Sequence, residues 1–345
     1  MSRTAIDGLH ALLRAPAAEP LPASLRARLV QAWDAVDADH ARRAPWPVIA
    51  DTLQVLSRLD ADASALLAAL LFDLPGLRAA VAGELAASHP AVRGLLEGQD
   101  AADPVWALHA GREAGRNGEG LRRLLLAIIQ DLRVVPILLA RQLAKMRVAD
   151  RLPEAERRAL AQLTRDLHAP LANRLGIWQL KWELEDLAFR HLEPETWRRL
   201  ARELDESRAA RERYIEAVKK QLGKALAAQG IGAEISGRPK HIYSIWRKMQ
   251  KKQLPLDRLY DLRAVRVMVE DVAACYAALG VVHALWAPVP GEFDDYIARP
   301  KPNGYSSLHT AVVGPEGRTL EVQIRTREMH EQAELGVAAH WRYKE

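Results

Sequence analysis

Two acidic residues lie in segments with the residue pattern of β-strands, and together they suggest a metal site. The segment 319–326 (TLEVQIRT) alternates apolar and polar residues, which puts Glu321 on the polar face of the predicted strand. Asp261 begins a second such segment, 261–269 (DLRAVRVMV), in which strict alternation turns Arg266 to the opposite face. If the two strands are neighbours, the two carboxylates could hold Mg²⁺, which proteins bind through one or two carboxylates and substrate phosphates. The alternative is a pair of ordinary salt-bridged acids on a polar sheet face.

A basic helix is predicted over residues 240–251 (KHIYSIWRKMQK). At about 100° per residue its apolar side chains fall on one side, and a hydroxyl falls among cations on the other. The polar side carries Lys240, Ser244, Arg247, Lys248 and Lys251. Arg238 comes just before the helix, and residues 237–266 carry a net charge of +7 in a chain whose total is +5. This concentration of charge favours a polyphosphate site, and the alternative is a solvated amphipathic helix.

The segment 290–309 (PGEFDDYIARPKPNGYSSLH) predicts a long loop with both acidic and basic side chains. Within it, Pro-Asn-Gly-Tyr at 302–305 is typical of a turn that leads into a strand. An exposed Tyr305 beside Asn303 and Lys301 could stack a nucleotide base and contact its edge. The alternative is a surface hairpin turn.

The elements that must position these residues change in kind along the chain. Apolar residues recur at helical spacing over 65–72, 121–132, 138–152 and 157–192, the last with a break expected near Pro170. A long charged helix is predicted over 202–230, ending at Gly230. Strand patterns follow at 232–237, 261–269, 307–314 and 319–326, interleaved with helical patterns at 240–252, 271–286 and 327–344. The pattern predicts an all-α domain followed by an α/β or α+β domain.

Composition excludes several classes of protein. With 49% hydrophobic and 27% charged residues the chain is typical of a globular protein and not of a disordered one. A single cysteine, Cys275, excludes a disulfide framework and is expected in the core. No apolar run is long enough to span a membrane and no secretory signal is evident, so we expect a cytoplasmic protein. His330 and Glu331 stand in His-Glu-x-x-Glu, which lacks the second histidine of a zinc helix, and no P-loop or serine-hydrolase motif occurs.

Long ordered blocks of the sequence resemble the synthetase domain of long RelA/SpoT homologues, the enzymes that make (p)ppGpp in the stringent response. The blocks are 237–252, 259–269, 292–312 and 320–345, and the stretch 170–192 looks like the segment that joins the two catalytic-type domains of that family. The resemblance implies transfer of the pyrophosphoryl group of ATP to the 3′-hydroxyl of GDP or GTP, with release of AMP and with Mg²⁺ as cofactor. It also implies an α+β multidomain fold, in which an all-α HD-type domain precedes a mixed-sheet, nucleotidyltransferase-like synthetase domain.

The resemblance also implies a role for each matching residue. Asp261 resembles the Mg²⁺ ligand, and Glu321 the acid that supports the metal and deprotonates the 3′-hydroxyl. Arg238 and Arg266 resemble the pair that sandwiches adenine. The residues that resemble phosphate contacts are Lys240, Ser244 and Lys248 on the ATP side and Lys301 on the GDP/GTP side. Tyr305 resembles the platform that stacks guanine, and the remaining acceptor-site positions are Asn303, His309 and Gln323.

Two departures from the family pattern refine the expectation. The acceptor-specificity loop reads Glu292, Phe293, Asp294, Asp295, the acidic form that resembles monofunctional RelA-type synthetases and hints at a preference for GDP. In the helical domain Phe72-Asp73 and Trp46-Pro47 stand where the family's hydrolases have His-Asp and His-Pro, and Arg141 replaces an acid. A site without imidazoles and with an added cation is a poor Mn²⁺ site, so we expect an inactive pseudo-hydrolase.

We therefore expect an inactive HD-type domain over 1–195, a connecting helical region over 196–230 and a (p)ppGpp synthetase domain over 231–345. Three alternatives remain: a silent regulatory or RNA-binding module, a different nucleotidyltransferase, and residual hydrolase activity. ATP and GDP or GTP are the expected partners, with no membrane partner. Relatives of this family continue into regions that bind the ribosome and sense tRNA, and the sequence ends at Glu345 before any such region. We expect contacts with the ribosome and tRNA only through those regions.

Overall fold

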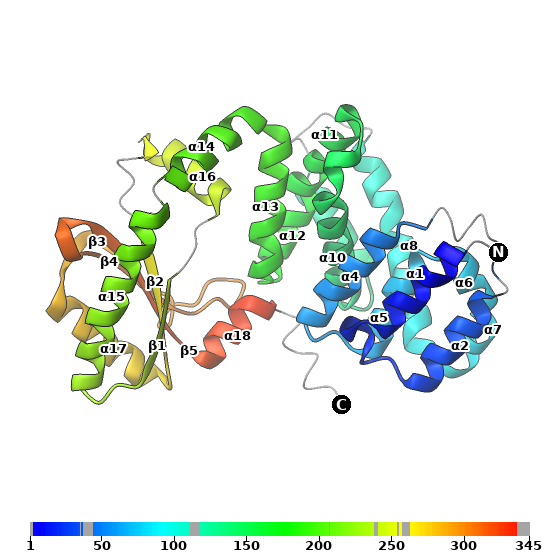
Figure 1. Cartoon of the computed structure of the whole chain (residues 1–345), viewed down its shortest axis with the longest axis horizontal. Coiled ribbons are helices and arrows are strands. Elements are labelled where there is room, and N and C mark those ends of the chain that lie inside the picture. Colours follow the sequence, from blue (N-terminus) through cyan, green and yellow to red (C-terminus); the bar gives the residue numbers. More distant parts are fainter. Residues whose placement is uncertain are drawn as a thin grey trace. The chain divides into compact units, whose positions relative to one another are not determined.

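The computed structural model describes residues 3–34, 36, 44–110, 118–206, 208–237, 241–253, 255–256 and 263–336. Figure 1 shows these residues as ribbons coloured along the sequence. They form two compact units that divide between Ala172 and Asn173.

The first unit is helical. No strand occurs among its described residues, which confirms the predicted all-α domain. The α-helices up to Arg174 are α1 (Arg3–Arg14), α2 (Ala23–Trp33), α4 (Trp46–Arg58), α5 (Ala63–Phe72), α6 (Pro75–Ala80), α7 (Ala82–Ser88), α8 (Pro90–Ala110), α9 (Gly118–Ile128), α10 (Val134–Arg147), α11 (Glu154–Leu163) and α12 (Ala169–Arg174).

Helices α5 and α10 form the centre of the first unit. Helix α5 reads ASALLAALLF, and the side chains from Ala65 to Leu71 are all buried. It begins at Asp62, whose carboxylate accepts a hydrogen bond from the Ala65 N–H at 2.7 Å, as an N-cap does. Helix α10 is buried along most of its length and packs on α4, while α5 packs on α8. A helix that is apolar all round must be surrounded by other helices.

The break predicted near Pro170 occurs a few residues later. Residues Thr164–His168 form a π-helical turn, in which the Ala169 N–H donates to the Thr164 carbonyl five residues earlier. Pro170 follows this turn inside α12 without ending the helix. The chain turns instead at Gly176, whose φ of +72° is readily adopted only by glycine.

The second unit is a mixed five-stranded sheet with helices. Its helices are α13 (Trp178–Leu192), α14 (Pro194–Glu206), α15 (Arg208–Ala228), α16 (Ile242–Lys252), α17 (Val272–Leu285) and α18 (Arg327–Leu335). Its strands are β1 (Ala233–Gly237), β2 (Ala264–Val269), β3 (Ala287–Asp295), β4 (Leu308–Val313) and β5 (Thr319–Thr326). The sheet order is β1-β2-β5-β4-β3, with β2 and β5 parallel and every other pair antiparallel. The predicted mixed sheet is confirmed.

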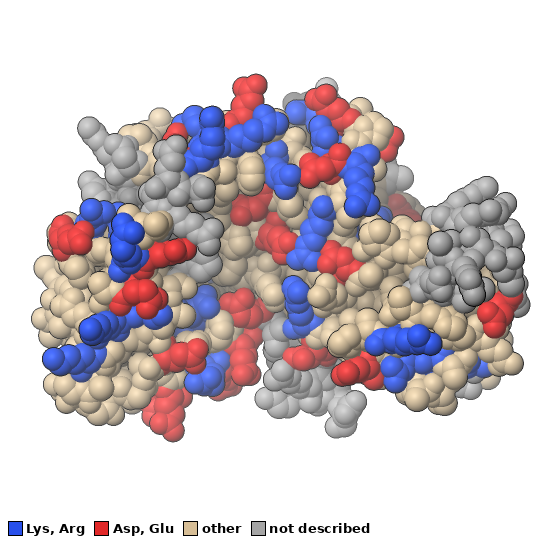
Figure 2. All heavy atoms as spheres, in the orientation of Figure 1, with Lys and Arg blue, Asp and Glu red and all other residues tan. Residues whose placement is uncertain are grey.

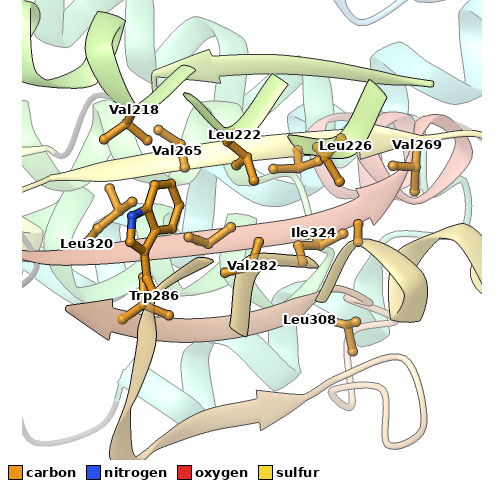
Figure 3. Close-up of a cluster of buried hydrophobic side chains, with 14 of the residues drawn as sticks. Val218, Leu222, Leu226, Val265, Val269, Val282, Trp286, Leu308, Leu320 and Ile324 are labelled. Carbon is orange, nitrogen blue, oxygen red and sulfur yellow. The ribbon is translucent and has the colours of Figure 1, made fainter. Parts of the chain in front are cut away.

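Helices α15 and α17 bury one face of this sheet. Figure 3 shows Val218, Leu222 and Leu226 of α15 directed at the apolar side chains of the strands. Alternation along β5 supplies Leu320, Val322 and Ile324 to the same core, as predicted for 319–326. Cys275 of α17 is buried here too, and burial, with Asp271 nearby, raises the pKa of its thiol to about 11. The other face of the sheet is left for polar side chains.

The compact units differ from the functional division expected from sequence. Helices α13, α14 and α15 all belong to the second unit, although residues 178–195 were expected in the first domain and 196–230 in a connecting region. The reason for α15 is direct, since its apolar side is part of the sheet core. The division into 1–195, 196–230 and 231–345 stays a prediction about function.

One strand escaped the sequence analysis. The predicted loop 290–309 begins with the second half of β3, which pairs with β4 from Phe293 to Asp295. Pro288, Pro290 and Gly291 disguise this strand, because proline cannot donate a ladder hydrogen bond. The sheet tolerates them because β3 is an edge strand with an irregular register between Pro288 and Phe293.

Candidate active site

The predicted site residues of the sheet form a row across the face that α15 and α17 leave uncovered (the uncovered face). Strand pairing aligns Arg266 of β2 with Gln323 of β5, Gln323 with His309 of β4, and His309 with Asp294 of β3. Cross-strand neighbours on one face lie about 5 Å apart. Four residues chosen from distant parts of the sequence are therefore adjacent, because the parallel pairing of β2 and β5 brings their segments together.

Glu321 occupies the next row and is partly exposed. Its neighbours in the pairing are Ala264 on β2 and Ala311 on β4, both of which have short side chains. The Gln323 amide donates to Glu321 Oε1 at 2.9 Å and holds the carboxylate on the uncovered face. A shared metal site required the segments 261–269 and 319–326 to be neighbouring strands, and from Ala264 onward they are paired.

A cavity of about 300 Å³ lies over this part of the sheet. Seven of the predicted site residues line it: Ser244, Lys248, Glu292, Asp294, His309, Glu321 and Gln323. Helix α16 contributes the hydroxyl and the ammonium, and the strands contribute the three carboxylates. The cavity therefore combines an ammonium and a hydroxyl from a helix with carboxylates from the sheet, groups that suit phosphate binding and proton acceptance.

Helix α16 is held over the sheet by its apolar side. Ile245 is buried against Leu204 of α14, with Ile242 and Met249 beside it. Trp246 packs on Phe189 of α13, with ring centroids 4.8 Å apart. This side was predicted from the helical spacing, and it turns Ser244 and Lys248 toward the cavity.

Tyr305 is buried, contrary to the exposed ring expected from sequence. It is 9% exposed, and its hydroxyl lies 2.7 Å from His309 Nε2. Trp178 and Tyr296 pack edge-on against its ring. The Lys301 ammonium lies 4.3 Å from the Tyr296 ring centroid and 5.3 Å from that of Tyr305. The turn therefore buries its aromatic ring among other aromatic side chains, where sequence alone suggested a free platform.

Asn303 has a local structural role in this turn. Its side-chain amide donates to the Asn173 carbonyl at 3.0 Å, and its Oδ1 accepts from the Tyr305 N–H at 3.4 Å. Of Lys301, Asn303 and Tyr305, it is Tyr305 that contacts the lining residue His309, and none of the three lines the cavity.

The four residues of the predicted acceptor-specificity loop lie in strand β3, and their side chains point to different sides of it. Glu292 and Asp294 line the cavity, whereas Phe293 is 47% exposed and packs edge-on against His283 of α17. Asp295 accepts hydrogen bonds from the Ile297 and Ala298 N–H groups and from the Tyr276 hydroxyl of α17. Desolvation raises the pKa of Asp295, but the hydrogen bonds outweigh it and the pKa is lowered overall. Asp295 therefore anchors the turn after β3 instead of facing the cavity.

Arg266 points to the uncovered face, on the same side as Glu321 and Gln323, because Val265 and Val267 face the core. It lies 3.7 Å from Glu334 of α18, and the same carboxylate oxygen lies 3.4 Å from the fully buried Arg325. Helix α18 thereby holds two arginines of the sheet in place. This contact was not predicted from sequence, since nothing in the spacing links 266 with 334.

Three predicted residues lie outside the described part of the chain. They are Arg238, Lys240 and Asp261. Strand β2 begins at Ala264 in the structure. The predicted orientation of Arg266 relative to Asp261 is therefore not tested and stays a prediction.

Of the two carboxylates predicted to bind Mg²⁺, Glu321 is among the described residues. No three His, Cys, Asp or Glu side chains in the described part of the chain converge on one point as a complete protein cage would require. Mg²⁺ does not need such a cage, because it is commonly bound by one or two carboxylates together with substrate phosphates and water. Glu321, between two alanines and at the cavity wall, fits this mode of binding.

Six of the thirteen lining residues were not among the predicted site residues, and two of these six have ring side chains. Trp182 of α13 and His241, just before α16, both face the cavity. His241 directly follows Lys240, a predicted phosphate contact. This position next to a predicted site residue could have identified His241 from the sequence. Trp182 had no such signal, because α13 was expected in the preceding domain.

The residues expected to mark an inactive hydrolase form an ion pair in the first unit. Arg141 is 4% exposed, and its Nε donates to Asp73 Oδ2 at 2.9 Å. Its Nη2 donates to Gln99 Oε1 at 2.6 Å, and its guanidinium lies over the Phe72 ring at 4.2 Å. Trp46 begins α4 and packs edge-on against Trp33. A cation already satisfies the Asp73 carboxylate at this position.

Charged side chains are interspersed on the surface. In the view of Figure 2 the described Lys and Arg residues alternate with Asp and Glu over both units. Residues 238–240, 254 and 257–262 of the basic segment 237–266 lie outside the described part of the chain. Within the described helices, none is both long and apolar enough to cross a membrane.

The two units match two known kinds of domain. Residues 37–178 match the description "HD domain", and residues 237–345 match "Region found in RelA / SpoT proteins". The chain thus contains an HD domain followed by a region of the kind found in RelA/SpoT proteins.

Curated relatives agree with this assignment. A GTP pyrophosphokinase of Escherichia coli (strain K12) is 49% identical over 299 residues, which are 86% of this chain and 40% of that protein. A probable guanosine-3′,5′-bis(diphosphate) 3′-pyrophosphohydrolase of Synechocystis is 50% identical over 228 residues, or 66% of this chain and 30% of that protein. The chain therefore spans well under half the length of these relatives.

Solved structures are similar in part. Small alarmone synthetase 1 from Bacillus subtilis bound to its product pppGpp is 24% identical, with a TM-score of 0.33 over 41% of this chain and 81% of that one. A GTP pyrophosphokinase family protein from Streptococcus pneumoniae is 26% identical, with a TM-score of 0.32 over 42% of this chain and 77% of that one.

Proposed function

We propose that this chain transfers the β,γ-pyrophosphoryl group of ATP to the 3′-hydroxyl of GDP or GTP, forming ppGpp or pppGpp. The observation that carries the proposal is the position of Glu321, which is flanked by two alanines on the sheet and lines the same cavity as Ser244 and Lys248. The relatives named GTP pyrophosphokinase support the same reaction class.

In this reaction the acceptor 3′-oxygen bonds to the β-phosphorus of ATP. The bond from that phosphorus to the oxygen shared with the α-phosphate breaks, and AMP leaves. Glu321 accepts the proton of the 3′-hydroxyl, while Ser244 and Lys248 bind the phosphates of ATP. Phosphoryl-type transfer depends mainly on positioning and on neutralising charge, and the groups that line the cavity supply both.

We assign Mg²⁺ to Glu321, with Asp261 as the second carboxylate predicted from sequence. When bound, the ion neutralises the charge of the substrate phosphates. Arg238, Lys240 and Arg266 stay proposed contacts of ATP. The proposed contacts of the acceptor are Lys301, Asn303, Tyr305, His309 and Gln323, with Glu292, Phe293, Asp294 and Asp295 as the segment that favours GDP over GTP.

The direct test is an assay with γ-labelled ATP, Mg²⁺ and either GDP or GTP. We expect label in ppGpp or pppGpp, and a loss of roughly 10²–10⁴-fold in rate for Glu321→Gln, the range of a general base. Glu270→Gln, an exposed glutamate at the end of β2, is the matched control and should retain the wild-type rate. Near-normal turnover by Glu321→Gln would remove it from the role of base.

We also propose that the HD unit does not hydrolyse (p)ppGpp. The supporting observation is the buried Arg141–Asp73 ion pair, because a metal ion at Asp73 would have to displace a guanidinium. Incubation of the protein with labelled ppGpp and Mn²⁺ should release no pyrophosphate, and release above the no-enzyme rate would contradict the proposal. We propose a cytoplasmic enzyme whose residues 1–345 do not themselves contact the ribosome or tRNA.

A further inference from the structure

The cavity has a lining residue that the proposed reaction leaves without a role. His241 stands at the N-cap position of α16 and faces the same cavity as Ser244, Lys248 and Glu321. Its own side chain makes no cap hydrogen bond to α16. The imidazole is therefore placed for some other purpose than helix capping.

Asp186 of α13 fixes the orientation of this imidazole. Its Oδ2 lies 2.9 Å from His241 Nδ1, and its Oδ1 accepts the Tyr243 N–H of α16 at 2.7 Å. One carboxylate thus caps the helix from a neighbouring element and also binds the histidine. With a carboxylate on Nδ1, that nitrogen carries a proton. Among the described residues no hydrogen-bond partner of Nε2 is found, so Nε2 is the nitrogen available to a ligand.

Trp182 of α13 also holds the His241 ring, by stacking on it. Its ring stacks on His241 with centroids 5.6 Å apart and an angle of 24° between the planes. Trp182 and Asp186 are four residues apart on α13, so both reach α16 from one side of that helix. Ring plane and ring rotation are therefore both fixed, as expected for a side chain that recognises a ligand.

The spacing of His241 relative to the proposed phosphate contacts decides which substrate it meets. Positions 241, 244 and 248 are separated by three and four residues, so they form one stripe along a helix. All three residues line the cavity. His241 therefore continues the row of proposed ATP phosphate contacts, and His309 and Gln323 of the proposed acceptor side lie on the sheet.

We propose that His241 donates a hydrogen bond from Nε2 to a phosphate oxygen of the ATP donor, with Asp186 as the positioning residue. This proposal rests on the proposed function. With Nδ1–H bound to Asp186, donation from Nε2 uses the ring with a proton on both nitrogens, and the bond to an anionic phosphate is charge-assisted. Residue 186 thus acts on nucleotide binding from a helix that was expected outside the synthetase domain.

Two substitutions of His241 separate its ring nitrogens. Asparagine places an amide nitrogen near the position of Nδ1 and leaves nothing at Nε2, whereas glutamine reaches the position of Nε2. We expect His241→Asn to raise the KM for ATP and the Kd of a non-hydrolysable ATP analogue about tenfold, the effect of one hydrogen bond to a charged group. His241→Gln should recover part of that loss, and the KM for GDP should stay within about twofold in both variants.

Asp186 is tested with a matched pair and a control. In Asp186→Asn the carbonyl still accepts the Tyr243 N–H, and the amide can donate to Nδ1, which keeps a neutral histidine with a proton on Nε2. We expect the KM for ATP to rise in the order wild type, Asp186→Asn, Asp186→Ala. The control is Asp271→Asn, because Asp271 caps α17 through the Ala274 N–H at the same 2.7 Å and lies away from the cavity. It should leave both KM values unchanged.

The outcomes separate this proposal from the proposed function. If the wild type makes (p)ppGpp and His241→Asn has an unchanged KM for ATP, or raises only that for GDP, the role of His241 is wrong and the function stands. If Asp186→Ala lowers only the melting temperature, Asp186 is structural. If the wild type binds the ATP analogue and makes no product, the function fails, and the analogue Kd of His241→Asn alone decides the role of His241. No binding by the wild type would overturn both.

Discussion

At the scale of single residues, sequence and structure agree best where a strand or helix fixes the direction of a side chain. Glu321, Gln323 and His309 were chosen from their segments, and strand pairing makes them neighbours on one face. Ser244 and Lys248 follow from helical spacing in the same way. Agreement is poorer for Tyr305, because burial of a turn residue depends on aromatic neighbours from three other segments.

Tyr305 can be tested for the stacking role proposed from sequence. We expect Tyr305→Ala to raise the KM for GDP by the equivalent of roughly 1–3 kcal/mol, the range for base–aromatic stacking. Tyr305→Phe should have a smaller effect, because it keeps the ring and loses only the hydrogen bond to His309. Steady-state kinetics with GDP as the varied substrate measures both. An equal loss in the two variants would assign the effect to the hydroxyl and not to the ring.

A substitution of Arg141 tests how much its ion pair with Asp73 stabilises the first unit. Replacing it with methionine leaves the Asp73 carboxylate in a poorly solvated site without its partner, and breaking a buried pair costs about 3–5 kcal/mol. We expect the urea midpoint of Arg141→Met to fall accordingly. The double variant Arg141→Met with Asp73→Asn should recover part of the loss, because the unpaired charge is gone. A double variant less stable than Arg141→Met would contradict this account.

At the scale of elements, α13 contributes more to the site than its sequence revealed. Its Trp178, Trp182 and Asp186 contact Tyr305 and His241, residues of the turn before β4 and of the start of α16. The helix itself was predictable from its spacing, but its partner was not, because contacts between elements distant in sequence leave no local pattern. Strand β3 was missed for a different reason, since edge strands tolerate the prolines and glycine that normally indicate a loop.

Gly176, at the start of this helix, links backbone conformation to the site. Its φ is +72°, and a Cβ there would lie 3.2 Å from the Asn303 carbonyl oxygen, which is a backbone atom. We expect Gly176→Ala to lower the free energy of unfolding by more than about 1 kcal/mol. Gly280→Ala is the control, because Gly280 is inside α17 with no atom near an added Cβ, and alanine there should stabilise by about 0.5–1 kcal/mol. Chemical denaturation measures both, and an equally stable Gly176→Ala would show that the turn can relax.

At the scale of the whole molecule, each unit contains a histidine that the fold keeps neutral. In the first unit His168 is 2% exposed and stacks on Trp106, with ring centroids 4.6 Å apart. Burial, with Lys145 and His109 nearby, lowers the pKa of His168 to about 3. In the second unit burial, Arg325 and Arg266 lower the pKa of His330 to about 4. Both units are therefore expected to lose stability in acid for the same reason.

The direction in which the free energy of unfolding changes with pH depends on whether the folded or the unfolded chain binds the proton more tightly. A histidine whose folded pKa lies below the ordinary value of about 6.5 takes up its proton preferentially in the unfolded chain. The stabilisation of the folded chain by the neutral histidine is present in full above about pH 6.5, and it is lost as the pH falls toward the pKa in the folded state. For His168 the loss between pH 6.5 and pH 5 amounts to about 2 kcal/mol. We expect His168→Phe to reduce the difference in free energy of unfolding between pH 7 and pH 5 by about that amount, measured by urea denaturation. A variant whose stability falls in parallel with the wild type over this range would show that His168 takes up its proton while the unit is folded.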